Sequence, residues 1–225
     1  MIQNYADFLE TLLSAGFSMG GGGSTDGVYS VIPCNWNEEA PYPTAVQWHT
    51  EDPETDPWEW RMRVLAERDD IAYAKLFFKK SGYITRDWYP CFLAARRGGR
   101  TFYDAYEGGT LSHAAKRIYE VVLAHGRMAS HEIKQAAGFG REDKAVFDRA
   151  LTELQMGLFV TVCGSQRTAN WASAVFCTTE HFWGQGVFAQ AHALAAEAAA
   201  QKITAQMQAL CPTARPKKIR KFIFG

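Results

Sequence analysis

The stretch from Leu111 to Thr178 constrains the fold most, because it carries three helical patterns followed by a strand pattern. The first helical pattern begins at Ser112 and the second at Ser130, both good N-cap residues, and the third follows Gly140. In each, apolar residues recur three or four positions apart, which predicts a helix buried on one face. These residues are Ala115, Ile118, Tyr119, Val122 and Leu123, then Ile133, Ala136 and Ala137, then Phe147, Leu151 and Leu154.

Two strands are predicted directly after these helices. Residues 158–162 are bulky and β-branched, residues 164–170 form a polar turn that contains a glycine, and residues 174–178 read as the return strand. Three helices and a hairpin in this order predict a winged helix, whose hairpin is the wing beside the third helix. That scaffold points toward nucleic acid, but it also serves as a protein contact.

The charges of the whole chain do not attract a polyanion, since 24 basic residues are balanced by 24 acidic ones. Residues 111–178 have eight basic and six acidic residues, which is only a small excess. In the third predicted helix Arg141, Lys144 and Arg149 stand among four acids, and Lys144 is spaced to pair with Asp148. The helix therefore fits either a DNA contact or a solvated face of mixed charge.

Two other segments have charge of one sign. The acidic segment, residues 38–59, has seven acids and no Lys or Arg, and the basic segment, residues 79–100, has six basic residues and one acid. The tail from Arg215 is also basic, without an acid. The basic segment is interleaved with aromatic residues, so it offers phosphate contacts and stacking faces. Alternatively, the acidic and basic segments neutralise each other across an internal surface.

Composition narrows the class further. Five widely spaced cysteines without a C-x-x-C motif predict reduced thiols in a cytoplasmic protein. The six histidines are scattered and none has zinc-helix spacing, so we expect no metal and no cofactor. The N-terminus reads as an amphipathic helix rather than a signal peptide, and no stretch is apolar enough to span a membrane.

The predicted fold class is α+β, in three regions. Residues 1–108 form an N-terminal α+β region, with a helix that begins at Asp56-Pro57 and a strand or short buried segment from Ile71 to Phe78. Residues 109–184 form the winged-helix domain. Residues 185–225 form one long helix, predicted from Val187 to Leu210, and the basic tail.

Several short motifs resemble a known family. They are Asp56-Pro57-Trp58-Glu59-Trp60-Arg61, then Ala72 to Lys80, Gly82-Tyr83-Ile84, Trp88-Tyr89-Pro90, Arg96-Arg97 and Leu154-Gln155-Met156. In these motifs the chain resembles bacterial AlkZ-related proteins, distant relatives of the AlkZ winged-helix DNA glycosylases. The resemblance implies a winged-helix protein linked to DNA and to repair of alkylated or crosslinked bases.

The resemblance does not carry a catalytic residue with it. AlkZ-type glycosylases have a Gln-apolar-Gln or Gln-apolar-Asp motif that positions the hydrolytic water. Gln206-Met207-Gln208 has this pattern, but it stands in the alanine-rich predicted helix, where glutamines are ordinary solvent-facing residues. Gln155 is followed by Met156 and Gly157, so it lacks the pattern.

Three hypotheses follow: a double-stranded DNA-binding protein without an identifiable catalytic motif, a glycosylase acting on alkylated bases, and a protein-interaction module. The residues predicted to contact DNA are Lys79, Lys80, Arg96, Arg97, Arg141, Lys144 and, on the wing, Arg167. The residues predicted to line a pocket for a base are Trp58, Trp60, Arg61 and Trp88. The alternative for these aromatic residues is the core, where each buries a large area.

Overall fold

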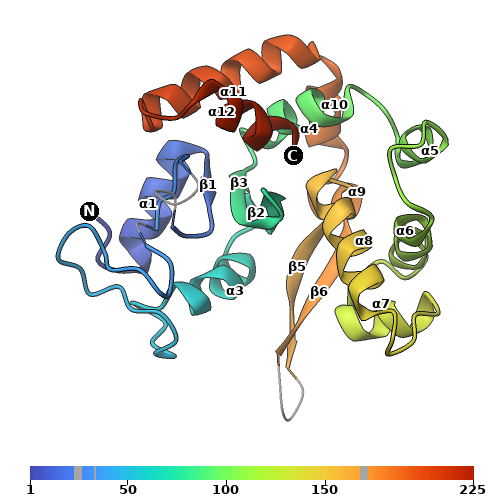
Figure 1. Cartoon of the computed structure of the whole chain (residues 1–225), viewed down its shortest axis with the longest axis horizontal. Helices are drawn as coiled ribbons and strands as arrows, with labels where there is room; N and C mark the ends of the chain where they lie inside the picture. Colours follow the sequence, from blue (N-terminus) through green and yellow to red (C-terminus); the bar gives the residue numbers. More distant parts are fainter. Residues whose placement is uncertain (23–26, 33, 168–171) are drawn as a thin grey trace.

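The computed structural model describes residues 1–22, 27–32, 34–167 and 172–225. The fold is α+β, with helices packed around one six-stranded antiparallel sheet of order β1-β3-β2-β5-β6-β4 (Figure 1). The strands are β1 (Phe17–Met19), β2 (Ile71–Phe77), β3 (Lys80–Thr85), β4 (Met128–Ala129), β5 (Val160–Arg167) and β6 (Ala172–Thr178). The predicted fold class is therefore right at this level.

The N-terminal helices are α1 (Tyr5–Ala15), which packs on β1 and β3, and α3 (Pro57–Glu67), which packs on β2 and β5. Each begins where the sequence provides a cap: the Asn4 side chain accepts from a backbone N–H of α1, and Asp56 caps α3 ahead of Pro57. Phe8 of α1 stacks on Trp60 of α3, with ring centroids 5.1 Å apart. Trp60 is fully buried, so it belongs to the core.

One sheet joins the N-terminal strands to the later hairpin. Tyr73 of β2 is paired with Val162 of β5, and the Gln155 side-chain oxygen accepts from the Lys75 backbone N–H at 2.9 Å. The sheet thus runs across the boundary predicted at residue 108, and the division into three regions stays a prediction.

Helices α6 (His113–His125), α7 (Ser130–Ala136) and α8 (Lys144–Met156) lie where the sequence predicted three helices. Ser112 caps α6, and Phe147, Leu151 and Leu154 of α8 are buried as predicted. The predicted burial of Leu123 and Ala136 is wrong, because both side chains are exposed. Hairpin β5–β6 follows, and β5 continues through residues that the sequence assigned to the turn.

The C-terminal region differs most from its prediction. The single helix expected from Val187 to Leu210 is two helices, α10 (Gln185–His192) and α11 (Ala196–Leu210), which follow the short α9 (Thr179–Trp183). The basic tail forms a further helix, α12 (Pro216–Phe224). α10, α11 and α12 all pack on α4 (Tyr89–Arg97), which precedes the short α5 (Phe102–Glu107).

Arg96 joins the ends of three helices. From the last turn of α4, its guanidinium donates to the Met156 carbonyl at the end of α8, at 2.8 Å. It also donates to the carbonyls of Ile223 and Phe222 in the last turn of α12, at 2.5 and 2.8 Å. Carbonyl groups at helix ends lack intrahelical donors, and a cation there also opposes the negative end of the helix dipole. Burial lowers the pKa of Arg96 to about 10, so the side chain keeps its charge at neutral pH.

Within the described part of the chain, no helix is both long and apolar enough to cross a bilayer.

Changing Arg96 to alanine is expected to lower the free energy of unfolding by about 3 kcal/mol, because three carbonyl groups lose a charged donor. Urea titration followed by circular dichroism measures this loss. Arg149→Ala is the matched control, since Arg149 is exposed on α8 and makes no hydrogen bond or ion pair with any described residue. Its effect should stay within about 0.5 kcal/mol. Equal stability of the two variants would contradict the role of Arg96.

Candidate nucleic-acid interface

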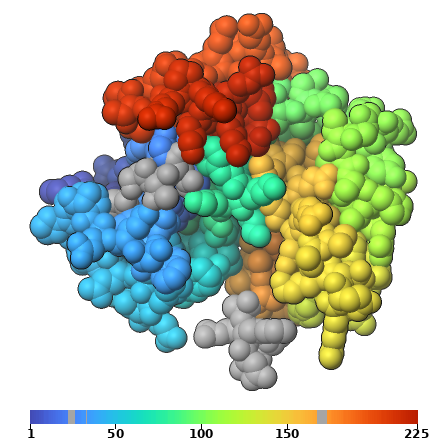
Figure 2. Space-filling view, in the orientation of Figure 1, coloured from blue at the N-terminus to red at the C-terminus, as the bar shows by residue number. Residues whose placement is uncertain are grey.

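A groove of about 640 Å³ lies where β2 and the C-terminal ends of α4, α8 and α12 meet. Figure 2 shows this face of the molecule, with α12 in red above, α8 in yellow to the right and the teal-green end of β2 between them. Most of the lining that is not charged comes from small or apolar side chains, including Ala105, Leu111, Met156, Phe159 and Phe224.

The charged lining of the groove is mainly basic. Two acids, Asp148 and Glu153, also line it, and both have partners: Asp148 pairs with Lys144, and Glu153 accepts from the Ser112 backbone N–H and hydroxyl at 2.7 and 2.8 Å. The cations that line the groove are Lys75, Lys79, Arg96, Arg97, Arg100 and Arg149.

Five of the six cations fall into two groups, and the sixth, Arg100, is exposed and donates to the carbonyls of Arg96 and Arg97. Lys75, Lys79 and Arg149 are exposed, and no carboxylate among the described residues forms an ion pair with them. Lys75 reaches across from β2 toward α8, with its ammonium 3.5 Å from the Thr152 hydroxyl. Lys79 stands in the turn between β2 and β3 with a φ of 64°, an uncommon backbone conformation for a lysine.

Arg97 belongs to the second group, together with Arg96. It is buried, and its guanidinium donates to the Glu180 carboxylate at 3.0 Å and lies 4.5 Å from the centre of the Phe159 ring. The other Glu180 oxygen is buried without a hydrogen-bond partner among the described residues. Arg96 and Arg97 were both predicted to contact DNA, but the structure places their guanidinium groups in contacts within the protein.

The remaining predicted DNA contacts lie in different places. Arg141 and Lys144 are exposed at the start of α8, and Lys144 forms the predicted pair with Asp148. Lys80 is exposed at the start of β3, beside Lys79. Arg167 ends β5, but its side chain lies outside the described residues, as do residues 168–171 of the predicted turn.

The predicted aromatic pocket is only half assembled. Trp58 and Arg61 line a second cavity of about 290 Å³, which shares Lys75 and Lys79 with the groove. Trp60 lies in the core, and Trp88 packs against Gly16 and Phe17 at the other side of the sheet. The sequence thus grouped two surface residues with two structural ones.

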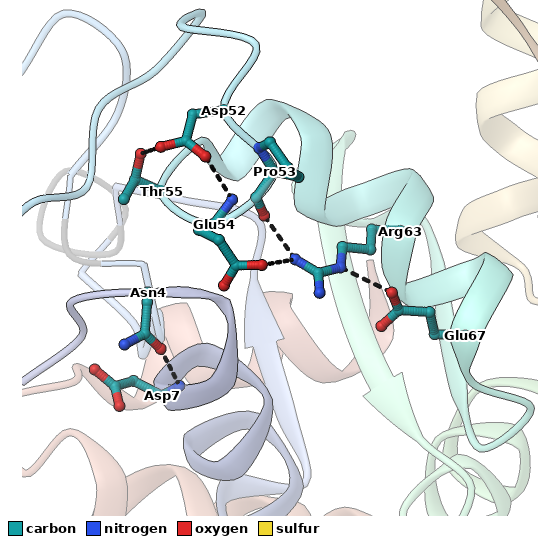
Figure 3. Close-up of polar contacts among 8 residues, drawn as sticks. All are labelled: Asn4, Asp7, Asp52, Pro53, Glu54, Thr55, Arg63 and Glu67. Atoms are coloured by element: carbon teal, nitrogen blue, oxygen red, sulfur yellow. Dashed lines mark hydrogen bonds and ion pairs between the residues drawn. The ribbon is translucent and has the colours of Figure 1, made fainter.

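The carboxylates of the acidic segment, residues 38–59, make contacts with α3 and with other residues of the same segment. Arg63 donates to the Glu54 carboxylate at 2.7 Å and to Glu67 at 2.8 Å (Figure 3). Asp52 accepts from the Glu54 backbone N–H and the Thr55 hydroxyl. Both Asp56 oxygens accept from backbone N–H groups, of Thr50, Glu51 and Trp58, so this carboxylate serves as the cap of α3.

Gln155 and Gln206, two of the three glutamines considered above, make hydrogen bonds within the protein. Gln155 is buried, and besides accepting from Lys75 it donates to the Leu151 carbonyl at 3.0 Å. Gln206 and Gln208 both stand on α11, where the Gln206 side chain donates to the Ala15 carbonyl at 2.9 Å. Neither lines the groove or the second cavity.

The DNA contacts predicted from the sequence do not include Lys75, nor Arg100, Arg149 and the four exposed cations of α12, which the sequence showed only as parts of basic or mixed-charge segments. Lys75 had a visible signal, because it is the one charged residue in the buried strand Ile71–Phe77. In α12, Lys218 and Lys221 lie 5.6 and 5.9 Å from the centre of the Phe78 ring, in the turn that carries Lys79. The basic side of α12 therefore continues the charge of the groove.

Comparison with known proteins identifies one family. The family described as AlkZ related matches residues 2–224, which is nearly the entire chain. The chain belongs to the AlkZ-related family. No curated protein and no solved structure matched it. The resemblance predicted from the sequence is therefore confirmed, and the AlkZ-related family suggests glycosylase-like relatives linked to DNA repair.

Changing Arg97 to glutamine is expected to lower the free energy of unfolding by about 3 kcal/mol, because the Glu180 carboxylate then keeps a charge without its partner. The midpoint of urea unfolding reports the loss. Arg86→Gln is the control, since Arg86 pairs with Asp69 on the surface and should contribute under about 1 kcal/mol. A larger loss in the Arg86 variant would contradict the buried pair.

Proposed function

We propose that this AlkZ-related protein binds double-stranded DNA along the groove between β2, α8 and α12. The observation that carries the proposal is the exposed group of Lys75, Lys79 and Arg149, none of which pairs with a carboxylate of a described residue. Placing unpaired cations side by side costs free energy through repulsion, which a polyanion removes. DNA presents such a charge continuously along each strand.

The order of elements from α6 to β6 supports the interpretation as a winged helix. Helix α6, strand β4, helices α7 and α8 and hairpin β5–β6 follow one another in the chain, and β4 pairs with β6. In this interpretation α8 is the third helix and the hairpin is the wing. Asp148 lines the groove but pairs with Lys144, so its negative charge is offset at the proposed interface.

Helix α12 completes the proposed interface. Lys217, Lys218, Arg220 and Lys221 are exposed, and none forms an ion pair with a described carboxylate. Phosphate contacts from α8, the β2–β3 turn and α12 would position the duplex without reading its sequence. We accordingly expect binding that depends strongly on salt and weakly on sequence.

The link to repair of damaged bases rests on the family. A second candidate function, release of an alkylated base, is favoured by the cavity beside Trp58, which opens next to the groove. Incubation with duplexes that carry alkylated bases, followed by detection of free base, tests that activity directly.

Changing Lys75, Lys79 and Arg149 to glutamine is expected to flatten the salt dependence of DNA binding. Each phosphate contact contributes about 0.9 to the slope of log K against log salt, so the slope should fall by about 2 to 3. Fluorescence anisotropy of a labelled duplex at several salt concentrations measures the slope. The control changes Arg86, Lys116 and Lys134, which lie outside the groove and α12, and should retain most of the slope. Equal slopes for both triple variants would contradict the proposal.

The cations on the two sides of α12 are expected to contribute differently to duplex affinity. Lys218→Gln with Lys221→Gln removes the charges beside the β2–β3 turn and should weaken duplex binding about tenfold at low salt, as for two lost phosphate contacts. Lys217→Gln with Arg220→Gln removes the same charge from the rest of the helix, where Arg220 lies near Phe224, and should have a smaller effect. Anisotropy titration compares the two. A larger loss in the second variant would exclude the proposed path of the duplex over α12.

A further inference from the structure

The cavity beside the groove has the features of a site for a single planar base. Its volume, about 290 Å³, is at the lower end of the range for small-molecule pockets, which suits one base better than a larger ligand. Its lining includes Tyr73 and Tyr83 from the sheet, and Trp58 and Arg61 from α3. The cavity shares Lys75 and Lys79 with the groove.

Trp58 and Arg61 form a preassembled stacking surface. The Arg61 guanidinium carbon lies 3.3 Å from the centre of the Trp58 ring, and Arg61 donates to the Trp58 carbonyl at 2.8 Å. Trp58 is 42% exposed, although its backbone N–H is fixed by the Asp56 cap. A guanidinium plane held in this way stacks on nucleobases, as do aromatic rings.

Asn35 supplies a hydrogen-bonding group to the lining of the cavity. Its side chain is half-buried and lines the cavity, and its amide makes no hydrogen bond with any described residue. A free amide carries a donor and an acceptor side by side, which matches the edge of a base. Gly21 lets the Trp48 ring pack closely against the backbone here: a Cβ at Gly21 would lie 2.9 Å from that ring, and its φ of 150° is unfavourable for other residues.

Lys75 and Lys79 connect the cavity to the DNA path. Both line the groove and the cavity, so a phosphate bound between them would belong to a strand whose base can enter the cavity. We propose, on the basis of the proposed function, that this cavity holds an unpaired nucleobase of bound DNA. The base stacks on the Arg61–Trp58 pair, and Asn35 contacts its edge.

The test compares two labelled duplexes that differ only in one extrahelical adenine, by fluorescence anisotropy. The wild-type chain should bind the bulged duplex about tenfold more tightly than the paired duplex, as expected for one stacked base. Trp58→Ala and Asn35→Ala should each remove most of this preference while retaining affinity for the paired duplex. Trp36→Ala is the matched control, because Trp36 is 70% exposed and does not line the cavity. The midpoint of urea unfolding establishes whether each variant is folded. If Trp58→Ala does not fold, Asn35→Ala alone still tests the cavity assignment.

The outcomes separate this inference from the proposed function. Equal affinity for both duplexes in the wild-type chain, or a preference unchanged in both cavity variants, overturns the cavity assignment and leaves DNA binding intact. If the wild-type chain binds neither duplex, a labelled single-stranded oligonucleotide becomes the probe. If the wild-type chain binds that strand and Trp58→Ala weakens the binding, the cavity assignment is supported although the proposed function fails. If the wild-type chain does not bind the strand either, both are overturned.

Discussion

The groove depends on one guanidinium group, that of Arg96. Three hydrogen bonds from this side chain hold the C-terminal ends of α8 and α12 against the end of α4. α8 brings Arg149 to the groove, and α12 brings Lys218 and Lys221 alongside it. The cation also offsets the negative ends of two helix dipoles, which would otherwise lower the positive potential where a phosphate is proposed to bind. Stability and the proposed binding surface therefore share one structural origin.

The cations around the groove have two roles: some hold the protein together, and others stay exposed where a ligand is proposed to bind. Arg96 and Arg97 are consecutive in the chain and end α4, and both are used within the protein, at carbonyl groups and at Glu180. Lys75, Lys79 and Arg149 come from different elements, and the fold leaves them exposed around the same hollow. Counting charges along the sequence cannot make this distinction, because it depends on which helix ends and carboxylates lie nearby in space.

Local signals in the sequence were enough for much of the fold. Asp56-Pro57 begins α3, Ser112 caps α6, and the spacing of Phe147, Leu151 and Leu154 predicts the buried face of α8. The break between α10 and α11 has no such signal, since residues 193–195 include neither glycine nor proline and the alanine-rich run favours helix throughout. For the site, Lys79, Trp58 and Arg61 were predicted. Lys75, Arg149 and the cations of α12 were not among the predicted contacts, because only the tertiary structure brings them to the same groove.

Amide hydrogen exchange of the protein with and without a short DNA duplex tests the central claim most directly. When the duplex binds, the account predicts slower exchange in three segments, namely the end of β2 with the β2–β3 turn, α8 from Asp148 to Met156, and α12. Exchange in α1, which packs on the β3 side of the sheet and lines neither the groove nor the second cavity, should stay unchanged. Protection centred on α1, or no protection in any of the three segments at saturating duplex, would contradict the groove as the DNA-binding surface.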